Sequence, residues 1–503
     1  MSSSEKHNTG NSSKADSSHK IDNNHKIDNN HKADNNHRAD NNHKADNNHR
    51  ADNNHMTINN AVPERNNNAA KSTFPAQTDL LDRVLRILEE EIIPAEGCTE
   101  PIALAYVAAL AAEYLGQTAE SMKIFVSGNI LKNVKSVVVP NSGGLTGIKV
   151  SAAMGFVAGK TNRELMVISD VTPSDMERVR LFMDNCEIEV LHEKTDIALY
   201  VRIEAAAGNE TSLVEMKHVH TNITRIEKNG SVVLARPCND ADFNSPLTDR
   251  KILSVELIYN LARSIDLSLI RPLFMKVVKL NSQIAEEGLR EVWGVNVGSR
   301  ILKNIESGIY GDDARNQCAS FAAAGSDARM SGCPLPVMTT CGSGNVGMAA
   351  SLPVIRYCQL KNFTEDEMIR ALFFSHLAAI HIKTNVGRLS AHCGAVCAAA
   401  ALGGALAFVN NGDLTAVANA IVNTLGNISG MICDGAKASC ALKIATGIYA
   451  AFDAATLGFY NRALHSGDGI IGRDVEDTIR NIGELSRAGM QHTDEVILEL
   501  MMK

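Results

Sequence analysis

The stretch SAHCGAVCAAAALGGALAFV, residues 390–409, consists almost wholly of alanine, glycine and other small or apolar residues. It has nearly the length of a membrane span, but Ala and Gly contribute little insertion energy and His392 stands near its start. Small residues let helices approach closely, so the stretch predicts a buried helix in a helical core. We expect no membrane-spanning segment.

The composition is typical of a globular protein that does not bind nucleic acid. The length of 503 residues is enough for two or three domains. Of these residues, 45% are hydrophobic, 21% charged and only 4% aromatic, and the scarcity of aromatic residues favours close-packed helices. The formal net charge is −8, and no basic face opposes it. Eleven cysteines are an odd number, and no charged leader precedes an apolar run, so we expect a cytoplasmic protein without a disulfide framework.

Residues 1–77 predict a disordered low-complexity tail. Histidine recurs every six residues from position 19 to position 55, in units such as HKADNN that carry almost no apolar side chains. Such units cannot offset chain entropy by burial. Weak metal binding by the evenly spaced imidazoles is the functional alternative.

Two helices are expected to open the fold. Apolar residues recur at helical spacing over 79–93, and Pro94 ends the run. A second helix is expected over 101–115, with Thr99 as its N-cap. This arrangement puts Cys98 at a helix N-terminus, where backbone N–H groups and the helix dipole lower the pKa of a thiol.

Residues 121–237 change character and predict a small sheet-containing unit. A helix is expected over 173–184, and short runs rich in strand-forming residues lie at 123–126, 187–191, 197–203 and 231–234. After Arg250 the pattern is helical nearly to the end.

We therefore expect an α+β fold, in which a small α/β domain precedes a large all-helical catalytic domain. The N-terminal helices and the small domain occupy residues 78–249, and the helical domain occupies residues 250–503.

Three cysteines in glycine- and alanine-rich contexts, Cys393, Cys433 and Cys440, are candidate metal ligands. Three thiolates without a matched fourth are the ligand set of an iron–sulphur cluster with one iron open to substrate. Zinc sites usually contain closer cysteine pairs. Cys397 lies four residues after Cys393 and would compete for a place in the set. The alternative is that all are buried free cysteines acting as small hydrophobes, and spacing alone does not decide.

Five separated strings resemble those of the L-cysteine desulfidase family, which is similar to the alpha chain of bacterial iron–sulphur L-serine dehydratases. The likeness spans roughly residues 80–500. The strings occur in order and are GCTEP at 97–101, SDARMSG at 326–332, GSGN at 342–345, RLSAHC at 388–393 and SGMICDGAKASC at 429–440.

The resemblance implies a 4Fe-4S cluster held by Cys393, Cys433 and Cys440, and a functional cysteine at Cys98. An open iron is a Lewis acid that can take the leaving group of a β-substituted amino acid without pyridoxal phosphate. Cys98 then either removes the Cα proton or caps the iron as a displaceable fourth ligand, and the sequence does not separate these roles.

The carboxylate of an amino-acid substrate needs hydrogen-bond donors. Two glycine-rich turns with backbone N–H groups suited to anions supply candidates, namely Ser142 and Gly143 in one and Ser343 and Asn345 in the other. Their glycines could instead serve only tight turns. Arg329 could clamp the carboxylate in a bidentate manner or pair with Asp327 as an ordinary salt bridge.

These patterns favour a cytoplasmic lyase that converts L-cysteine to pyruvate, ammonia and sulphide. L-serine dehydratase is the alternative within the same chemistry. Two alternatives come from other classes. A non-enzymatic metal-binding or scaffold protein would act through the His-rich tail. A zinc hydrolase would keep its activity in air and regain it when zinc alone is added. We expect a small amino-acid substrate, no nucleic-acid or membrane partner and, by default, an isologous homodimer.

Overall fold

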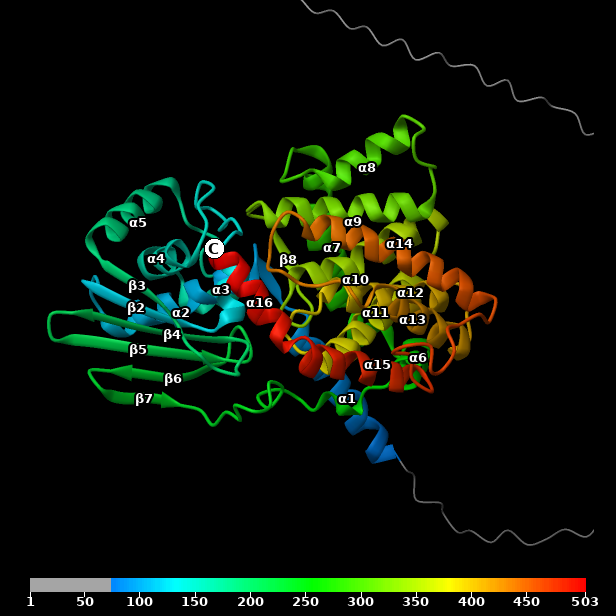
Figure 1. Ribbon diagram of the computed structural model, residues 1–503, viewed down its shortest axis with the longest axis horizontal. Helices are drawn as coiled ribbons and strands as arrows, with labels where there is room; N and C mark the ends of the chain where they lie inside the picture. Colours follow the sequence, from blue (N-terminus) through cyan, green and yellow to red (C-terminus); the bar gives the residue numbers. More distant parts are fainter. Residues whose placement is uncertain (1–73) are drawn as a thin grey trace, which may run out of the picture. The chain divides into compact units, whose positions relative to one another are not determined.

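The computed structural model describes residues 74–503 and confirms the α+β class (Figure 1). Most of the predicted tail lies outside the described residues. Its last four residues, 74–77, belong instead to the first helix, α1 (Phe74–Glu91). This helix ends before Pro94, as the sequence predicts, because proline cannot continue a helix.

A six-stranded sheet forms the first layer of the smaller part, with the strand order β3-β2-β4-β5-β6-β7. β2 and β3 run parallel and all other neighbours run antiparallel. The strands are β2 (Ser121–Val126), β3 (Glu187–His192), β4 (Tyr200–Ala207), β5 (Glu210–Lys217), β6 (Ile223–Lys228) and β7 (Ser231–Ala235). The sequence interpretation missed β5 and β6, because charged residues on their outward face hide the alternation of buried residues.

Helices cover one face of this sheet. α2 (Thr99–Leu115) contacts β4 and β5, and α4 (Ile148–Ala158) crosses α2. The crossing is so close that a Cβ atom at Gly155 would lie 2.0 Å from the backbone oxygen of Ala105. α5 (Pro173–Asn185) packs on α4, where the rings of Phe156 and Phe182 stack with centroids 5.1 Å apart.

The opening stretch forms α12 (Gly394–Val409), a buried helix as predicted. It contacts α10, α11, α13 and α14, and Gly403 and Gly404 leave room for side chains of α13 and α11. The helices of this larger part are α6 (Val255–Ser264), α7 (Leu267–Arg290), α8 (Val297–Glu306), α9 (Ala314–Met330), α10 (Gly344–Lys361), α11 (Glu365–Val386), α12, α13 (Leu414–Ile428), α14 (Cys440–Phe459), α15 (Val475–Glu484) and α16 (Gln491–Met502).

Among the described residues, α14 alone has the length and mean hydropathy of a membrane span. Half of its apolar window is buried, and it contacts α9, α12 and α13. These contacts are those of a core helix in a helical protein.

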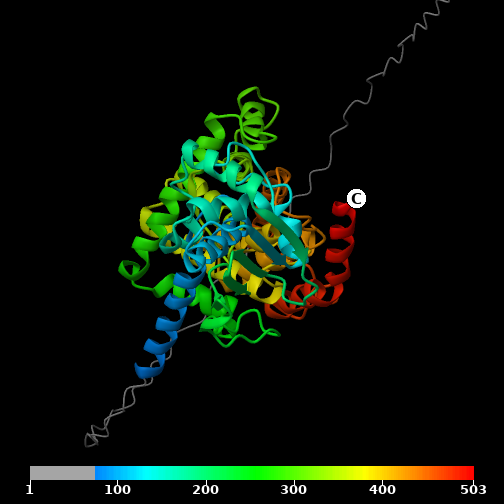
Figure 2. The same ribbon diagram turned by 90° about the vertical axis from the view of Figure 1, so that its left-hand side faces the viewer.

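Two contacts between elements connect the sheet part to the helical part. β1 (Pro94–Glu96) pairs antiparallel with β8 (Pro336–Met338), and α16 packs on α3 (Gly128–Val134) (Figures 1 and 2). Apolar side chains of α1, including Val84 and Leu88, belong to the core of the helical part rather than to that of the sheet. The boundary between residues 249 and 250 stays a prediction.

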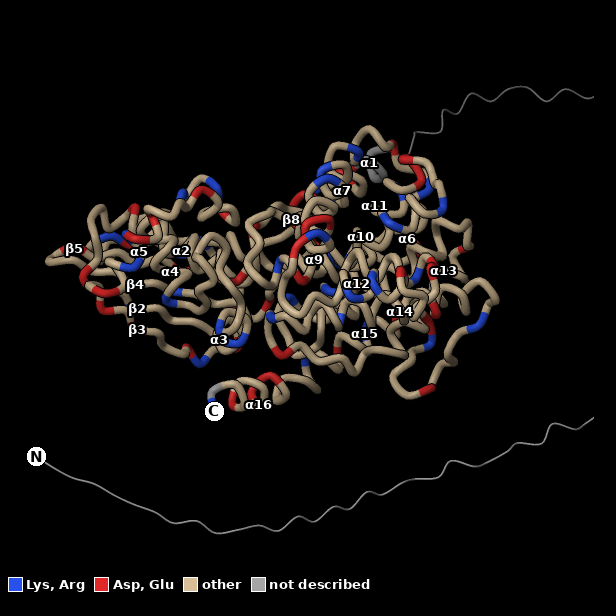
Figure 3. Tube along the Cα trace, turned by 90° about the horizontal axis from the view of Figure 1, so that it is seen from above, with Lys and Arg blue, Asp and Glu red and all other residues tan. Residues whose placement is uncertain are grey.

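All eleven cysteines are free thiols. In the view of Figure 3, Lys and Arg positions are interspersed with Asp and Glu positions along the chain in both parts.

Candidate functional site

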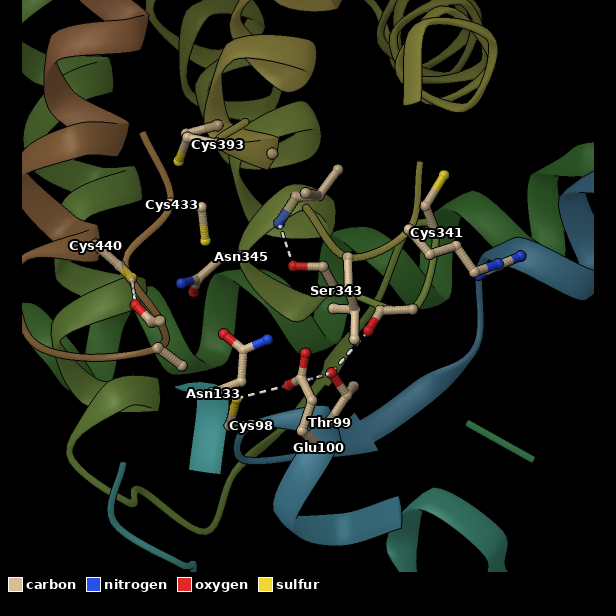
Figure 4. Close-up of a pocket in the computed structure, with 18 of the residues that line it drawn as sticks. Cys98, Thr99, Glu100, Asn133, Cys341, Ser343, Asn345, Cys393, Cys433 and Cys440 are labelled. Carbon is tan, nitrogen blue, oxygen red and sulfur yellow. Dashed lines mark hydrogen bonds between the residues drawn. The ribbon is translucent and has the colours of Figure 1, made fainter. Parts of the chain in front are cut away.

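A pocket lies between elements of the sheet part and the helical part. Its volume, counted with the opening to solvent, is about 770 Å³. Figure 4 shows the three candidate ligands Cys393, Cys433 and Cys440 along one wall, with Cys98 and Glu100 opposite. The pocket brings together seven of the nine residues that the sequence analysis selected, namely Cys98, Arg329, Ser343, Asn345, Cys393, Cys433 and Cys440.

Four helices begin at this pocket. Cys98, Ser343 and Cys393 are the N-caps of α2, α10 and α12, and Cys440 is the first residue of α14. A helix N-terminus carries a partial positive charge and unpaired backbone N–H groups. Four of them around one pocket favour anions there, both thiolates and a bound carboxylate.

The backbone holds the first two cysteines side by side. Cys393 N–H donates to the carbonyl of Met431 at 3.1 Å, and Cys433 N–H donates to that of Ala391 at 2.6 Å. The interaction between the two neighbouring thiols, assisted by the charge of Lys132, lowers the pKa of Cys433 and raises that of Cys393.

This donor set fits an iron–sulphur cluster. Cys393 lies at the start of α12, Cys433 and Cys440 lie in the segment that leads into α14, and all three line one wall of the pocket. Cys397, by contrast, is completely buried within α12 and does not line the pocket. Cys393, Cys433 and Cys440 are therefore the cysteines that could hold such a group on this wall.

On the opposite wall, Cys98 lies against a carboxylate. Its Sγ donates to Oε2 of Glu100 at 3.0 Å, and Thr99 Oγ1 donates to the carbonyl of Gly342 at 2.7 Å. Burial and the negative charge of Glu100 raise the pKa of Cys98 well above its ordinary value. The expected lowering of this pKa by the helix N-terminus is therefore wrong, because desolvation and a like charge outweigh the helix dipole. The N-cap is also Cys98 itself rather than Thr99.

Positive groups surround the space between the walls. Arg329 is 2% exposed, its Nε has no hydrogen-bond partner, and a Cβ atom at Gly344 would lie 2.3 Å from that nitrogen. The expected alternative, a pair with Asp327, does not form, since Asp327 accepts the backbone N–H of Gly298 at 2.9 Å. Lys383 and Arg388 also line the pocket. An unpartnered buried guanidinium is suited to a carboxylate.

Ser142 and Gly143 lie outside the residues that line the pocket. Ser142 Oγ instead accepts the N–H of Leu145 at 2.8 Å, and Gly143 has a φ of +74°, which a tight turn requires. The loop forms a turn, which was the alternative to substrate binding, and the substrate-binding role of Ser142 and Gly143 stays a prediction.

Comparison with known proteins places the chain in a family. Residues 162–499 match the model of the serine dehydratase alpha chain. The chain belongs to the serine dehydratase alpha chain family. It is 59% identical over 423 residues to a UPF0597 protein of Fusobacterium nucleatum, covering 84% of this chain and 99% of the relative. It is 41% identical over 420 residues to a UPF0597 protein of Lachnoclostridium phytofermentans, covering 84% and 99% of the two chains.

The serine dehydratase alpha chain match contains Arg329, the GSGN turn and all three wall cysteines, whereas Cys98 precedes it. The relatives extend over 84% of this chain, which is more than the family model spans. The expected resemblance to a serine dehydratase-like family is confirmed.

Sequence reasoning missed several pocket residues of this serine dehydratase alpha chain family member. Glu100 lies within the GCTEP string, and a search for polar residues beside Cys98 could have found it, whereas Asn133 lies in none of the quoted strings. Arg388 is the first residue of the RLSAHC string and could have been found there, whereas His220 and Lys383 stand in segments that no local pattern marks. His392 also lines the pocket, and burial lowers its pKa to about 4.

Proposed function

We propose that the protein is an iron–sulphur-dependent lyase that eliminates the β-substituent of a small L-amino acid, most readily that of L-cysteine. One observation carries this proposal: Cys98 and Glu100 lie opposite three thiols, across a pocket that Arg329, Lys383 and Arg388 also line. The family's description, serine dehydratase alpha chain, supports a lyase of amino-acid catabolism.

Cys393, Cys433 and Cys440 would hold a 4Fe-4S cluster, which supplies an open iron as a Lewis acid for the leaving group. Cys393 is buried and Cys433 and Cys440 are half-buried, which limits the access of water to this wall. Lys132 Nζ donates to the carbonyl of Cys433 at 3.2 Å and fixes the loop that carries this ligand.

The substrate carboxylate would bind Arg329, assisted by Ser343 and Asn345 at the N-terminus of α10. Arg329 is held in place by packing against Gly344, so little side-chain entropy is lost on binding. Anchoring this carboxylate fixes the orientation of the Cα–H bond relative to both walls.

Cys98, whose thiol donates to Glu100 at 3.0 Å, would accept the Cα proton as a thiolate, after the thiol has released its own proton to solvent. Loss of the Cα proton and of the β-thiolate gives 2-aminoacrylate, which tautomerises and hydrolyses to pyruvate and ammonia, with sulphide as the other product. The rival role of Cys98, as a displaceable fourth iron ligand, would leave proton removal to another group.

L-serine is the second candidate substrate, because the matched family is described by its serine dehydratase activity. Hydroxide is the poorer leaving group of the two. A homodimer and a cytoplasmic location also remain predictions for this enzyme.

The test is an anaerobic assay of L-cysteine against L-serine that measures pyruvate and sulphide together. We expect the wild type to be brown and to release pyruvate and sulphide in equal amounts. Cys433→Ala should lose both the colour and the turnover, because one of the three proposed cluster ligands is gone. Cys397→Ala is the matched control and should keep both. An active wild type without iron would refute the cluster.

Deletion of residues 1–56 separates the lyase from a metal-binding scaffold that acts through its histidines. The shortened chain should keep its iron and its turnover, since every proposed site residue lies beyond residue 97. Loss of both would favour the scaffold.

A further inference from the structure

A second group of metal-binding side chains lies outside the pocket. His218, Cys238 and Asp240 each offer one ligand atom, and these three atoms lie within 4.8 Å of one another. His218 stands in the turn between β5 and β6, whereas Cys238 and Asp240 belong to the segment that follows β7. The pocket residues described above do not include any of the three.

The orientation of His218 suits a metal ligand. Its Nε2 lies 3.1 Å from the carbonyl oxygen of Asn239, and since a carbonyl only accepts, Nε2 carries the proton. Nδ1 then carries the lone pair that a metal would bind, and metal-binding histidines usually donate their other N–H in this way. Burial lowers the pKa of His218, so the ring is neutral at neutral pH.

The backbone of His218 is held in an unusual conformation. Its φ is +66°, in the left-handed region that non-glycine residues rarely adopt. The His218 N–H donates to the carbonyl of Leu199 at 2.9 Å, which anchors the turn to the sheet. The ring is thereby directed toward the segment after β7.

We propose that His218, Cys238 and Asp240 bind a divalent cation of the zinc class. An imidazole, a thiolate and a carboxylate with one open position, filled by water, form a ligand set typical of zinc and cobalt(II), whereas magnesium and calcium prefer oxygen alone. On binding, the Cys238 thiol releases its proton to solvent and the sulphur–metal bond forms.

Lys217 competes with the cation. Its Nζ lies 3.1 and 3.3 Å from the two oxygens of Asp240, so a metal must share this carboxylate with the ammonium group or displace it. Removal of that positive charge should therefore strengthen metal binding, whereas removal of a ligand weakens it. The two changes move affinity in opposite directions, which a merely structural role would not produce.

A bound metal would fasten the segment after β7 to the turn between β5 and β6. That turn carries His220 two residues later, and His220 lines the pocket 4.0 Å from Oε1 of Glu100. The metal would thus stabilise the part of the sheet that presents His220, without itself taking part in the proposed reaction.

The test uses cobalt(II) titration of the full iron-containing protein, followed by competition with zinc. The thiolate-to-cobalt absorption band reports only sites with a cysteine, and residues 1–73 contain none. We expect wild type to show a band that Cys238→Ser lacks and Asp240→Asn binds about tenfold or more weakly. Lys217→Met should bind cobalt more tightly than wild type.

Asp242→Asn is the matched control, since Asp242 is an exposed carboxylate of the same segment that accepts the N–H of Asn244 at 3.0 Å. It should titrate like wild type. Asp240 is also exposed, so its replacement preserves the fold, which circular dichroism checks. Identical titrations for wild type, Cys238→Ser and Asp240→Asn would overturn the proposal, whatever the outcome of the lyase assay.

Discussion

Cys98 holds its proton more tightly than a free cysteine, although it caps a helix. Burial is the largest cause and the charge of Glu100 the second, while Arg329 acts in the opposite direction. The thiolate that the proposed reaction requires is therefore the minor form at neutral pH. Glu100 both receives the thiol hydrogen and limits how far Cys98 ionises.

A pH profile of Glu100→Gln tests this relation. If the Cys98 thiolate accepts the Cα proton, kcat/KM rises with pH, because the thiol loses its proton as pH increases. The substitution removes a negative charge that raises the pKa of Cys98, so the rise of kcat/KM should move to lower pH.

Cys98→Ala should abolish turnover and keep most of the iron. Loss of iron in that variant would instead make Cys98 a fourth ligand.

Close helix crossings set the positions of the helix N-termini at the pocket. α2 carries Cys98 at its start and crosses α4 at Gly155, where only a hydrogen atom fits against the backbone of α2. In α14, which begins with Cys440, Gly447 approaches α12 less tightly, with a Cβ atom there 3.0 Å from the methyl group of Ala399. In both helices, a close contact at a small residue about two turns from the helix start thus fixes the position of the cysteine at that start.

Gly155→Ala should destabilise the protein by about 1–3 kcal/mol, because its Cβ would meet a backbone oxygen that cannot move cheaply. Gly447→Ala is the matched control inside a helix, and we expect a change near zero. There the roughly 1 kcal/mol gain in helix propensity offsets mild crowding. Urea unfolding of both variants provides the measurement, and equal stabilities would contradict the crossing argument.

The pocket depends on contacts between the sheet part and the helical part. Lys132 belongs to α3, is nearly completely buried, contacts the Cys433 carbonyl at 3.2 Å and forms an ion pair with Asp494 in α16. It joins three segments that lie far apart in the sequence. Its charge also helps to lower the pKa of Cys433.

Lys132→Met should raise the pKa of Cys433 and leave the Asp494 carboxylate without its partner. We expect a loss of about 1–3 kcal/mol in stability and faster removal of iron by a chelator. Lys135→Met changes a neighbouring, exposed lysine in the same way and should resemble wild type. Equal iron retention in both variants would show that Lys132 does not support the loop.

Much of the local structure follows from sequence. Periodicity predicted α1, α2 and α5, composition predicted the buried α12, and four strands were found because their runs are rich in strand formers. β5 and β6 escaped because their exposed faces are charged. Seven site residues were recognisable within strings that resemble a known family, but the position of Cys98 at a helix N-terminus wrongly predicted a lowered pKa.

By itself, the sequence determined the fold class, the small-residue helices and the cysteines available as ligands, because these depend on composition and near-neighbour spacing. Only the tertiary structure decided which residues share the pocket. It brought Glu100, His220 and Lys383 together with the three wall cysteines, and left Ser142 and Gly143 outside. The physical reason is that burial and long-range contacts, which set charge and distance in a site, arise only when separate segments pack together.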